Sequence, residues 1–427
     1  MVDAHQTFVI VGGGVAGASA AEALRSEGFT GRVILICDER DHPYERPPLS
    51  KRFLTGRDGR DTLFVHEPAW YARADIELHL GQPAVHLDRA ARAVRLGDGT
   101  RLAYDKLLLA TGAEPRRLDV PGTDLAGVHH LRRLAHAERL RAVLASLGRD
   151  NGHLVIAGAG WIGLEVAAAA RGYGAEVTVV EPEPTPLHPV LGPELGSLFA
   201  DLHREHGVRF HFGARLTGIS GQDGVVLAAH TDDGEEYPAH DVLAAIGAAP
   251  RTALAEAAGL AVVDRAEGGG IAVDASLRTS DPDIFAAGDA AAAWHPLLRT
   301  RLRVDHWASA LHGGPDAARA MLGRRVVHDR VPYFFSDQYD VSLEYSGYAP
   351  PGSYDQVVCR GDIGKRRFIA FWLSEGRLLA GMNVNVWDVA GPVQRLIRSR
   401  ARIDPDDLAN PAVPLTSLLT GAVGDRP

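Results

Sequence analysis

Short apolar segments alternate with glycine turns and helical segments in the first half of the chain. Residues 7–11 form a β-branched apolar run, which predicts a buried parallel strand. A glycine turn follows at once, residues 18–27 are compatible with a helix, and a second apolar run, residues 32–37, leads to Asp38. The glycines fit a Gly-x-Gly-x-x-Gly pattern and are Gly12, Gly14 and Gly17. This order of strand, glycine turn, helix, strand and acid predicts a dinucleotide-binding βαβ unit.

Each part of this unit has a physical role in nucleotide binding. The glycines allow a tight turn and let the backbone approach a pyrophosphate, whose charge is stabilised at a helix N-terminus. Asp38 can accept hydrogen bonds from the two hydroxyls of a ribose. A glycine pattern alone would also fit an ordinary strand–helix turn, so the prediction depends on the complete unit.

The same unit occurs a second time. Residues 153–157 predict a strand, a helical segment extends to Tyr173, and the strand at residues 176–181 ends at Glu181. The second set of glycines is Gly158, Gly160 and Gly163. Two complete units predict two bound dinucleotides. They also explain the most apolar stretch, residues 154–170, which is too short for a membrane span and contains a glutamate.

Further strand patterns set the domain organisation. Apolar strands end in three more glycine turns, which contain Gly112, Gly247 and Gly288, and Asp289 follows the last of these. The pattern predicts an α/β fold with two Rossmann-like nucleotide-binding domains, the first split by the second, and a C-terminal α+β domain. The predicted boundaries are residues 1–115 and 244–325 for the first domain, 116–243 for the second and 326–427 for the third.

The composition of the chain argues against several classes of function. The chain has 45 Lys and Arg against 54 Asp and Glu, a formal net charge of −9, which argues against nucleic-acid or anionic-membrane binding. The two cysteines, Cys37 and Cys359, exclude a disulfide scaffold, a four-cysteine metal site and a Cys-x-x-Cys redox pair, and we expect no metal. The N-terminus lacks the features of a signal peptide, so we expect a cytoplasmic protein.

Two further motifs carry a family resemblance. The segment 44–51 (Tyr-Glu-Arg-Pro-Pro-Leu-Ser-Lys) and the segment 335–340 (Phe-Ser-Asp-Gln-Tyr-Asp) resemble those of FAD-dependent bacterial ferredoxin reductases. That family includes putidaredoxin reductase and the reductases of aromatic-ring dioxygenases, within the pyridine-nucleotide–disulfide oxidoreductase superfamily. The resemblance implies that the first unit binds FAD and the second binds NAD. It also implies electron transfer from NADH through FAD to a [2Fe–2S] ferredoxin that serves a cytochrome P450 or a ring-hydroxylating dioxygenase.

The resemblance also implies roles for individual residues. Lys51 would lie beside the flavin isoalloxazine and form an ion pair with Glu165, and Phe335 stands where relatives commonly carry Trp near the nicotinamide. The other implied FAD contacts are Gly12, Gly14, Ala16 and Gly17 at the pyrophosphate, Asp38 at the ribose, Ala84 near the adenine, Arg132, Asp289 at the ribityl chain and Trp307 at the pyrimidine end.

The positions of charged residues suggest which nucleotide the chain prefers and where a protein partner could dock. Glu181 can accept hydrogen bonds from a 2′,3′-diol but repels a 2′-phosphate, which predicts NADH over NADPH. Arg299, Arg301 and Arg303 alternate, so an extended segment would place them on one face, where an acidic ferredoxin could dock. The same arginines could instead balance nearby acids on a solvated strand.

Two other functions stay open from the sequence. One is a reductase for another acceptor, such as rubredoxin, a quinone or monodehydroascorbate. The other is a NADH-gated interaction protein that resembles apoptosis-inducing factor. The sequence leaves the oligomeric state open between monomer and dimer.

Overall fold

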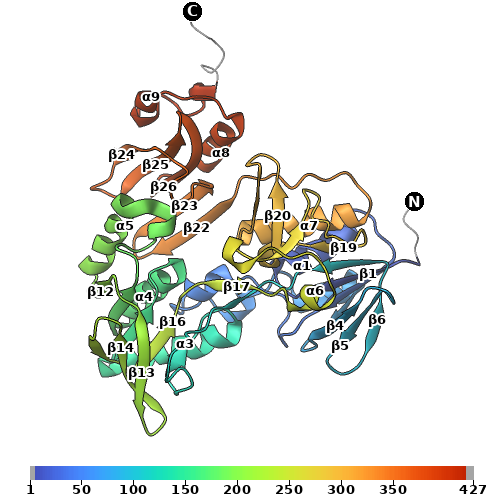
Figure 1. Ribbon diagram of the computed structural model, residues 1–427, viewed down its shortest axis with the longest axis horizontal. Coiled ribbons are helices and arrows are strands. Elements are labelled where there is room, and N and C mark those ends of the chain that lie inside the picture. The colour runs from blue at the N-terminus through green and yellow to red at the C-terminus, as the bar shows by residue number, and fades with distance from the viewer. Residues whose placement is uncertain (1–4, 420–427) are drawn as a thin grey trace, which may run out of the picture. The chain divides into compact units, whose positions relative to one another are not determined.

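The computed structural model describes residues 5–419, and the chain divides into two compact units (Figure 1). The first unit contains the chain up to Pro47 together with Gly59–Glu114 and Ala248–Arg330. The second contains Pro48–Asp58, Pro115–Gly247 and the chain from Val331 onward.

One short segment is grouped differently in the structure than in the predicted domains. The sequence places Pro48–Asp58 in the first domain, whereas the structure groups it with the second unit. The reason is non-local burial: Leu54 lies fully buried in the apolar core of the second unit, and the Tyr173 hydroxyl donates to the Leu54 carbonyl at 3.0 Å. The predicted domain boundaries remain predictions.

A five-stranded parallel sheet forms the core of the first unit, in the order β19-β7-β1-β2-β3. Its central strands are nearly continuous apolar runs, as expected for strands covered on both faces. Because β2 and β7 lie on opposite sides of β1, the strand order switches at the carboxyl end of β1, where such sheets bind ligands. The strands are β1 (Thr7–Val11), β2 (Arg32–Ile36), β3 (Ile76–His79), β7 (Lys106–Leu109) and β19 (Ile284–Ala286).

Helix α7 (Trp307–Met321) brings the returning part of the chain against helix α1 (Val15–Ser26). The approach is close, because a Cβ added at Gly314 would lie 2.2 Å from the Ala16 carbonyl oxygen. Any side chain at Gly314 would therefore push α7 away from the turn that holds the first glycine motif.

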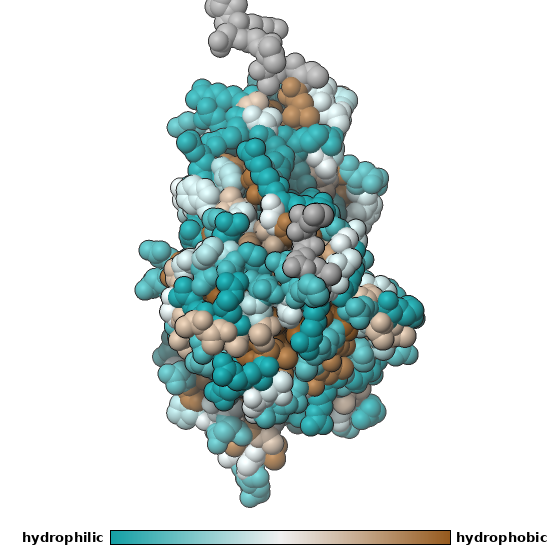
Figure 2. Space-filling view, turned by 90° about the vertical axis from the view of Figure 1, so that its right-hand side faces the viewer, coloured by the Kyte–Doolittle hydropathy of each residue, from teal (hydrophilic) through white to brown (hydrophobic). Residues whose placement is uncertain are grey.

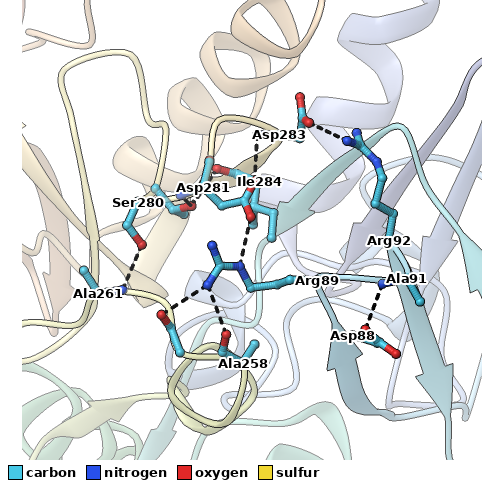
Figure 3. Close-up of polar contacts among 12 residues, drawn as sticks. Asp88, Arg89, Ala91, Arg92, Ala258, Ala261, Ser280, Asp281, Asp283 and Ile284 are labelled. Carbon is cyan, nitrogen blue, oxygen red and sulfur yellow. Dashed lines mark hydrogen bonds and ion pairs between the residues drawn. The ribbon is translucent and has the colours of Figure 1, made fainter.

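Ion pairs fix the loop that leads into β19 (Figure 3). Arg89 Nε lies 2.9 Å from Asp281, and Arg92 Nη1 lies 2.7 Å from Asp283, which also pairs with Lys106 at 2.5 Å. Arg89 also donates to the Ala258 carbonyl at 3.4 Å. These contacts hold the start of the strand that carries the Gly288–Asp289 turn.

Smaller elements complete the first unit. Two three-stranded sheets have the orders β4-β5-β6 and β18-β20-β21. The bounds are α2 (Pro68–Arg73), β4 (Ala84–Asp88), β5 (Ala93–Leu96), β6 (Arg101–Ala103), β8 (Ala113–Pro115), β17 (Ala248–Pro250), α6 (Ala253–Ala257), β18 (Ile271–Val273), β20 (Ala291–His295) and β21 (Thr300–Leu302), with 3-10 turns η2 (Arg60–Leu63), η3 (Arg265–Glu267) and η4 (Gly288–Ala290).

The second unit repeats the nucleotide-binding arrangement. Its parallel sheet has the strand order β12-β11-β10-β16-β9. Strand β10, which leads into the second glycine turn, lies between β11 and β16, so the strand order switches at its carboxyl end. An antiparallel sheet, β13-β14-β15, accompanies it. The bounds are η1 (Pro47–Ser50), β9 (Val128–His129), α3 (Leu134–Asp150), β10 (His153–Ala157), α4 (Trp161–Tyr173), β11 (Glu176–Glu181), α5 (His188–Glu205), β12 (Val208–Phe212), β13 (Leu216–Gln222), β14 (Val225–Thr231), β15 (Glu236–Pro238) and β16 (Asp241–Ala244).

The C-terminal part is a five-stranded antiparallel sheet in the order β22-β23-β26-β25-β24. One face contributes Phe334, Tyr345 and Trp372 to an apolar core shared with α4 and α5, and the Phe334 ring lies 4.9 Å from that of Trp161. The predicted fold class is therefore confirmed. The bounds are β22 (Tyr333–Gln338), β23 (Val341–Gly347), β24 (Gln356–Asp362), β25 (Arg367–Ser374), β26 (Arg377–Val384), α8 (Ala390–Ser399), α9 (Pro405–Ala409) and η5 (Ser417–Leu419).

The face of the molecule in Figure 2 carries mostly hydrophilic residues, with smaller hydrophobic patches between them. Among residues 5–419, no helix has the length and apolar character needed to cross a bilayer.

Candidate functional site

The first glycine turn is shaped for a pyrophosphate. Gly12 has φ +125°, and a Cβ there would lie 2.0 Å from the Ala110 carbonyl oxygen; a Cβ at Gly17 would lie 2.0 Å from the Gly12 oxygen. Gly14, by contrast, has open space in front of it. Gly14 is also the N-cap of α1, which has neither a side-chain cap nor an acidic residue in its first turn. The turn thus offers uncapped backbone N–H groups and room for an anion, which fits the pyrophosphate of FAD.

The second glycine turn has the same construction. Gly158 has φ +101°, and its Cβ would lie 2.6 Å from the Ala245 oxygen, while a Cβ at Gly163 would lie 2.1 Å from the Gly158 oxygen. Gly160 faces open space and caps α4 without a side-chain hydrogen bond. The residues present therefore fit a second pyrophosphate, as in NAD.

The acids at the ends of the second strands have different partners. Asp38 Oδ2 accepts a hydrogen bond from Arg251 Nη1 at 2.9 Å. Glu181 accepts from the backbone N–H of Ala159, inside the second glycine turn, at 2.6 Å and from that of Glu183 at 3.0 Å. Sequence reasoning missed Arg251, because it lies 213 positions from Asp38 and in no motif.

The Gly288–Asp289 turn lies against the first glycine motif. Gly288 has φ +70°, and a Cβ there would lie 3.1 Å from the Ala16 Cβ. Asp289 is buried in this turn. Trp307 begins α7, and burial raises the pKa of the Glu45 carboxyl while a hydrogen bond from Trp307 partly offsets this.

Three further residues predicted to contact a cofactor are Ala84, Arg132 and Gly247. Ala84 begins β4 and pairs with Leu96, and Arg132 precedes α3 in the second unit. Gly247 is exposed, with φ +93°, and its carbonyl accepts from the Arg116 N–H at 2.9 Å. Their cofactor roles remain predictions.

The predicted ion pair between Lys51 and Glu165 is present. Lys51 Nζ lies 2.7 Å from Glu165 Oε1, and the side chains are only 10% and 2% exposed. Lys51 follows the short turn η1, whereas Glu165 lies near the start of α4. The pair is therefore buried and is not a solvated surface contact. Its role toward the flavin remains a proposal.

Aromatic and hydroxyl groups complete the surroundings of this pair. Lys51 Nζ lies 5.3 Å from the centroid of the Phe335 ring, within range of a cation–π interaction. Ser336 Oγ donates to Glu165 Oε1 at 2.6 Å, and Ser50 Oγ donates to Glu165 Oε2. Sequence reasoning missed both serines, although each lies inside a motif that it used.

The predicted arginine surface is not formed as expected. Arg299 lies in the left-handed turn between β20 and β21, with φ +54°. Arg301 Nη1 donates to the carbonyls of Val273 at 2.6 Å and Ala292 at 2.8 Å. Arg303 pairs with Asp305, and its side chain is 13% exposed. The expectation of three arginines on one extended face is wrong, because a hairpin turn interrupts the segment and backbone carbonyls bind the guanidinium of Arg301.

Both cysteines are free thiols with suppressed reactivity. Burial raises the pKa of Cys37 to about 12, with smaller contributions from Asp38 and Glu39. Burial also raises the pKa of the half-buried Cys359. Neither thiol is a ready nucleophile at neutral pH.

Comparisons with known proteins agree with this geometry. The model of the pyridine nucleotide-disulphide oxidoreductase family matches residues 6–314, and the reductase C-terminal model matches residues 333–419. The chain belongs to the pyridine nucleotide-disulphide oxidoreductase family. Members of this family and its ferredoxin reductase relatives use FAD and NAD(H), which is consistent with the two glycine turns.

Individual relatives match between 82% and 99% of the chain. The anthranilate 1,2-dioxygenase system ferredoxin–NAD(+) reductase component of Burkholderia cepacia is 39% identical over 413 residues, which are 96% of this chain and 99% of that protein. Rubredoxin–NAD(+) reductase of Pseudomonas putida is 36% identical over 351 residues, 82% of this chain and 88% of that protein. The crystal structure of the covalent putidaredoxin reductase–putidaredoxin complex superposes with a TM-score of 0.93 at 33% identity and covers 99% of this chain and 100% of that chain.

Proposed function

We propose that this protein is a NADH-dependent flavoprotein reductase that passes electrons through FAD to a [2Fe–2S] ferredoxin, which serves a cytochrome P450 or a ring-hydroxylating dioxygenase. The observation that carries the proposal is the similarity to ferredoxin reductases over almost the entire chain, C-terminal domain included. When bound, FAD supplies the chemistry that links a two-electron donor to a one-electron acceptor.

The protein's own groups bind and orient in this proposal. The two glycine turns bind the pyrophosphates through backbone N–H groups, and Asp38 and Glu181 bind the riboses. Lys51 supplies a fixed positive charge toward the flavin, and Glu165 balances and orients that charge. The hydride step itself requires no side chain as acid or base.

The nucleotide in this proposal is NADH. Glu181 accepts a hydrogen bond from the Ala159 N–H in the second glycine turn, which supports the proposal that its negative charge faces the ribose 2′ position of the nucleotide. No arginine follows within ten residues to neutralise that phosphate. Like-charge contacts of this kind disfavour NADPH.

The proposed docking surface for the ferredoxin is the segment that carries the three arginines. Of the three arginines considered from the sequence, Arg299 and Arg301 are exposed, and Arg301 also donates to two backbone carbonyls, which leave its charge unchanged. Arg303 pairs with Asp305 and is 13% exposed, so Arg299 and Arg301 keep the predicted role of attracting an acidic ferredoxin. Monomer and dimer are both compatible with this function.

Anaerobic stopped-flow measurements test the proposal. NADH should reduce the flavin of the purified protein rapidly, and the reduced protein should then reduce a [2Fe–2S] ferredoxin faster than it reduces rubredoxin, a quinone or monodehydroascorbate. Preference for one of these other acceptors would identify a different reductase. Slow reduction by NADH with no competent acceptor would instead favour a NADH-gated interaction protein.

A further inference from the structure

Glu165 is one end of a line of buried polar side chains that connects α4, the C-terminal sheet and α5. Ser336 Oγ donates to Glu165 at 2.6 Å, and Gln338 Nε2 donates to Ser336 Oγ at 3.2 Å. Gln338 Oε1 lies 2.8 Å from His203 Nε2, and His203 Nδ1 lies 3.2 Å from the Tyr339 hydroxyl. Glu165 is 3% exposed, Ser336 and Gln338 are 1% exposed, and His203 is fully buried.

The hydrogen positions along this line follow from its carboxylate end. The ionised Glu165 only accepts, so Ser336 must donate to it and can accept only from the amide N–H of Gln338. This turns the Gln338 carbonyl toward His203, so His203 Nε2 carries the hydrogen and Nδ1 accepts from Tyr339. All four hydrogen bonds therefore run in the same direction, toward Glu165.

The charge state of His203 fits this direction. Burial lowers the pKa of His203 to about 4; the hydrogen bond to Gln338 opposes the shift and the nearby His206 adds to it. His203 is thus neutral at ordinary pH and presents one donor and one acceptor, as the line requires.

We propose that Ser336, Gln338 and His203 are positioning residues that fix the Glu165 carboxylate and, through it, the Lys51 ammonium for the reaction with NADH. This inference rests on the proposed function, in which Lys51 and Glu165 serve the flavin. Glu165 accepts three hydrogen bonds, from Lys51, Ser50 and Ser336, so it has little freedom to rotate. Of these three donors, Ser336 is the one that Gln338 and His203 hold in place.

The line orients groups and does not conduct protons. A proton path needs members that accept one proton while they release another, as hydroxyl and imidazole groups do. The amide of Gln338 does neither at ordinary pH, and it occupies the middle of the line. The orientation of the Gln338 amide fixes which atoms along the line donate and which accept, and therefore the direction in which the Ser336 hydroxyl points.

A serine substitution with a matched control tests the proposal. Ser336→Ala removes one donor from Glu165, whereas Ser346→Ala removes a hydroxyl that is equally buried in the same sheet but accepts from Gln394 outside the line. Loss of a hydrogen bond to a charged group typically changes an equilibrium constant about tenfold, and loss of the same amount of positioning free energy at Glu165 would slow flavin reduction by about the same factor. We therefore expect Ser336→Ala to slow flavin reduction by NADH about tenfold, and Ser346→Ala to leave it within twofold. The melting temperatures of both variants serve as the stability comparison.

A double-mutant cycle separates positioning from a purely structural role. If Ser336 acts through the Glu165 carboxylate, adding Ser336→Ala to Glu165→Gln should change the rate less than twofold. If Ser336→Ala slows both backgrounds equally, Ser336 does not act through Glu165 and the proposal is overturned.

Nitrogen-15 NMR of the histidine side chains gives a readout that does not depend on activity. The signal lost in His203→Asn should show the neutral Nε2–H form from pH 9 down to about pH 5, with or without FAD. A predominant Nδ1–H form, or titration near the ordinary histidine pKa, would overturn the proposed direction of the line. A protein that NADH reduces but that reduces no ferredoxin would overturn only the proposed acceptor. A flavin that NADH does not reduce would overturn both.

Discussion

Removing one member of the Lys51–Glu165 ion pair should cost more stability than removing both. The pair is 2.7 Å apart, with side chains 10% and 2% exposed, so either partner left alone is a charge buried without its counter-ion. Such a loss typically costs about 3–5 kcal/mol, whereas replacing a whole buried pair by neutral groups is often close to neutral. We expect about 3 kcal/mol for Lys51→Met and for Glu165→Gln, and about 1 kcal/mol for the double variant.

Urea unfolding of the FAD-loaded protein, followed by tryptophan fluorescence, provides the measurement. The control is Glu205→Gln in the same unit, which breaks the pair with Arg366, whose side chains are 57% and 22% exposed respectively. Exposed pairs of this kind contribute roughly 0–1 kcal/mol. Flavin reduction by NADH should be slow in both single variants, because each removes one partner of the pair. It should stay slow in the double variant, because that variant regains stability but still lacks the positive charge of Lys51.

Two results would refute this reasoning. Single variants that lose no more stability than Glu205→Gln would show that the buried charges are solvated in solution. A double variant whose loss equals the sum of the single losses would show that the two side chains do not interact. A stable double variant with fast flavin reduction would leave the stability argument intact but remove the proposed role of Lys51.

Three further predictions concern other parts of the molecule. Glu181→Gln keeps an oxygen for the Ala159 N–H but removes the charge, so the ratio of kcat/KM for NADH over NADPH should fall by roughly tenfold; equal values in the parent protein would contradict the assignment of Glu181. Burial raises the pKa of Asp283, but hydrogen bonds from Lys106 and Arg92 outweigh this effect and leave the pKa low. Asp283→Asn should therefore lower the free energy of unfolding by about 1 kcal/mol at pH 7, and by progressively less as the pH falls below about 4. A loss that does not depend on pH would contradict the ion pairs. The pKa of His203 is lowered to about 4, so this residue contributes stability above pH 6.5 that is lost as the pH falls toward 4. Acid should therefore reduce the stability advantage of the parent over His203→Asn by up to roughly 3 kcal/mol. A constant difference across that range would show that His203 does not titrate differently in the folded protein.

The local parts of the site could be predicted from the sequence. Strand, glycine turn and helix are adjacent along the chain, and the glycines at 12 and 158 are required by positive φ and by contacts with a neighbouring strand end. The Lys51–Glu165 pair came from the family resemblance and not from the pattern, since 114 positions separate the two residues.

The parts that could not be predicted depend on contacts between distant segments. Leu54 decides where Pro48–Asp58 packs, but its burial depends on a core formed by residues more than 80 positions away. Alternation of Arg299, Arg301 and Arg303 predicted a common face, yet a left-handed turn at Arg299 and two backbone carbonyls near Arg301 decided otherwise. Period two describes a strand only where the chain stays extended, and sequence alone did not locate the hairpin.

The position of β22 explains how neighbouring residues of one motif reach the same ion pair. Phe335 and Ser336 are adjacent in a strand and therefore point to opposite faces of the sheet. Nevertheless the Phe335 ring lies near Lys51 Nζ, and the Ser336 hydroxyl binds Glu165. β22 is the edge strand of its sheet, and the face that carries Ser336 packs against α4, the helix that carries Glu165. Phe335 lies on the other face of β22, and its ring centroid is 5.3 Å from Lys51 Nζ, so one residue contacts the cation and the other the carboxylate. A substitution at 335 should therefore change the surroundings of Lys51 without breaking the line of hydrogen bonds that ends at Glu165.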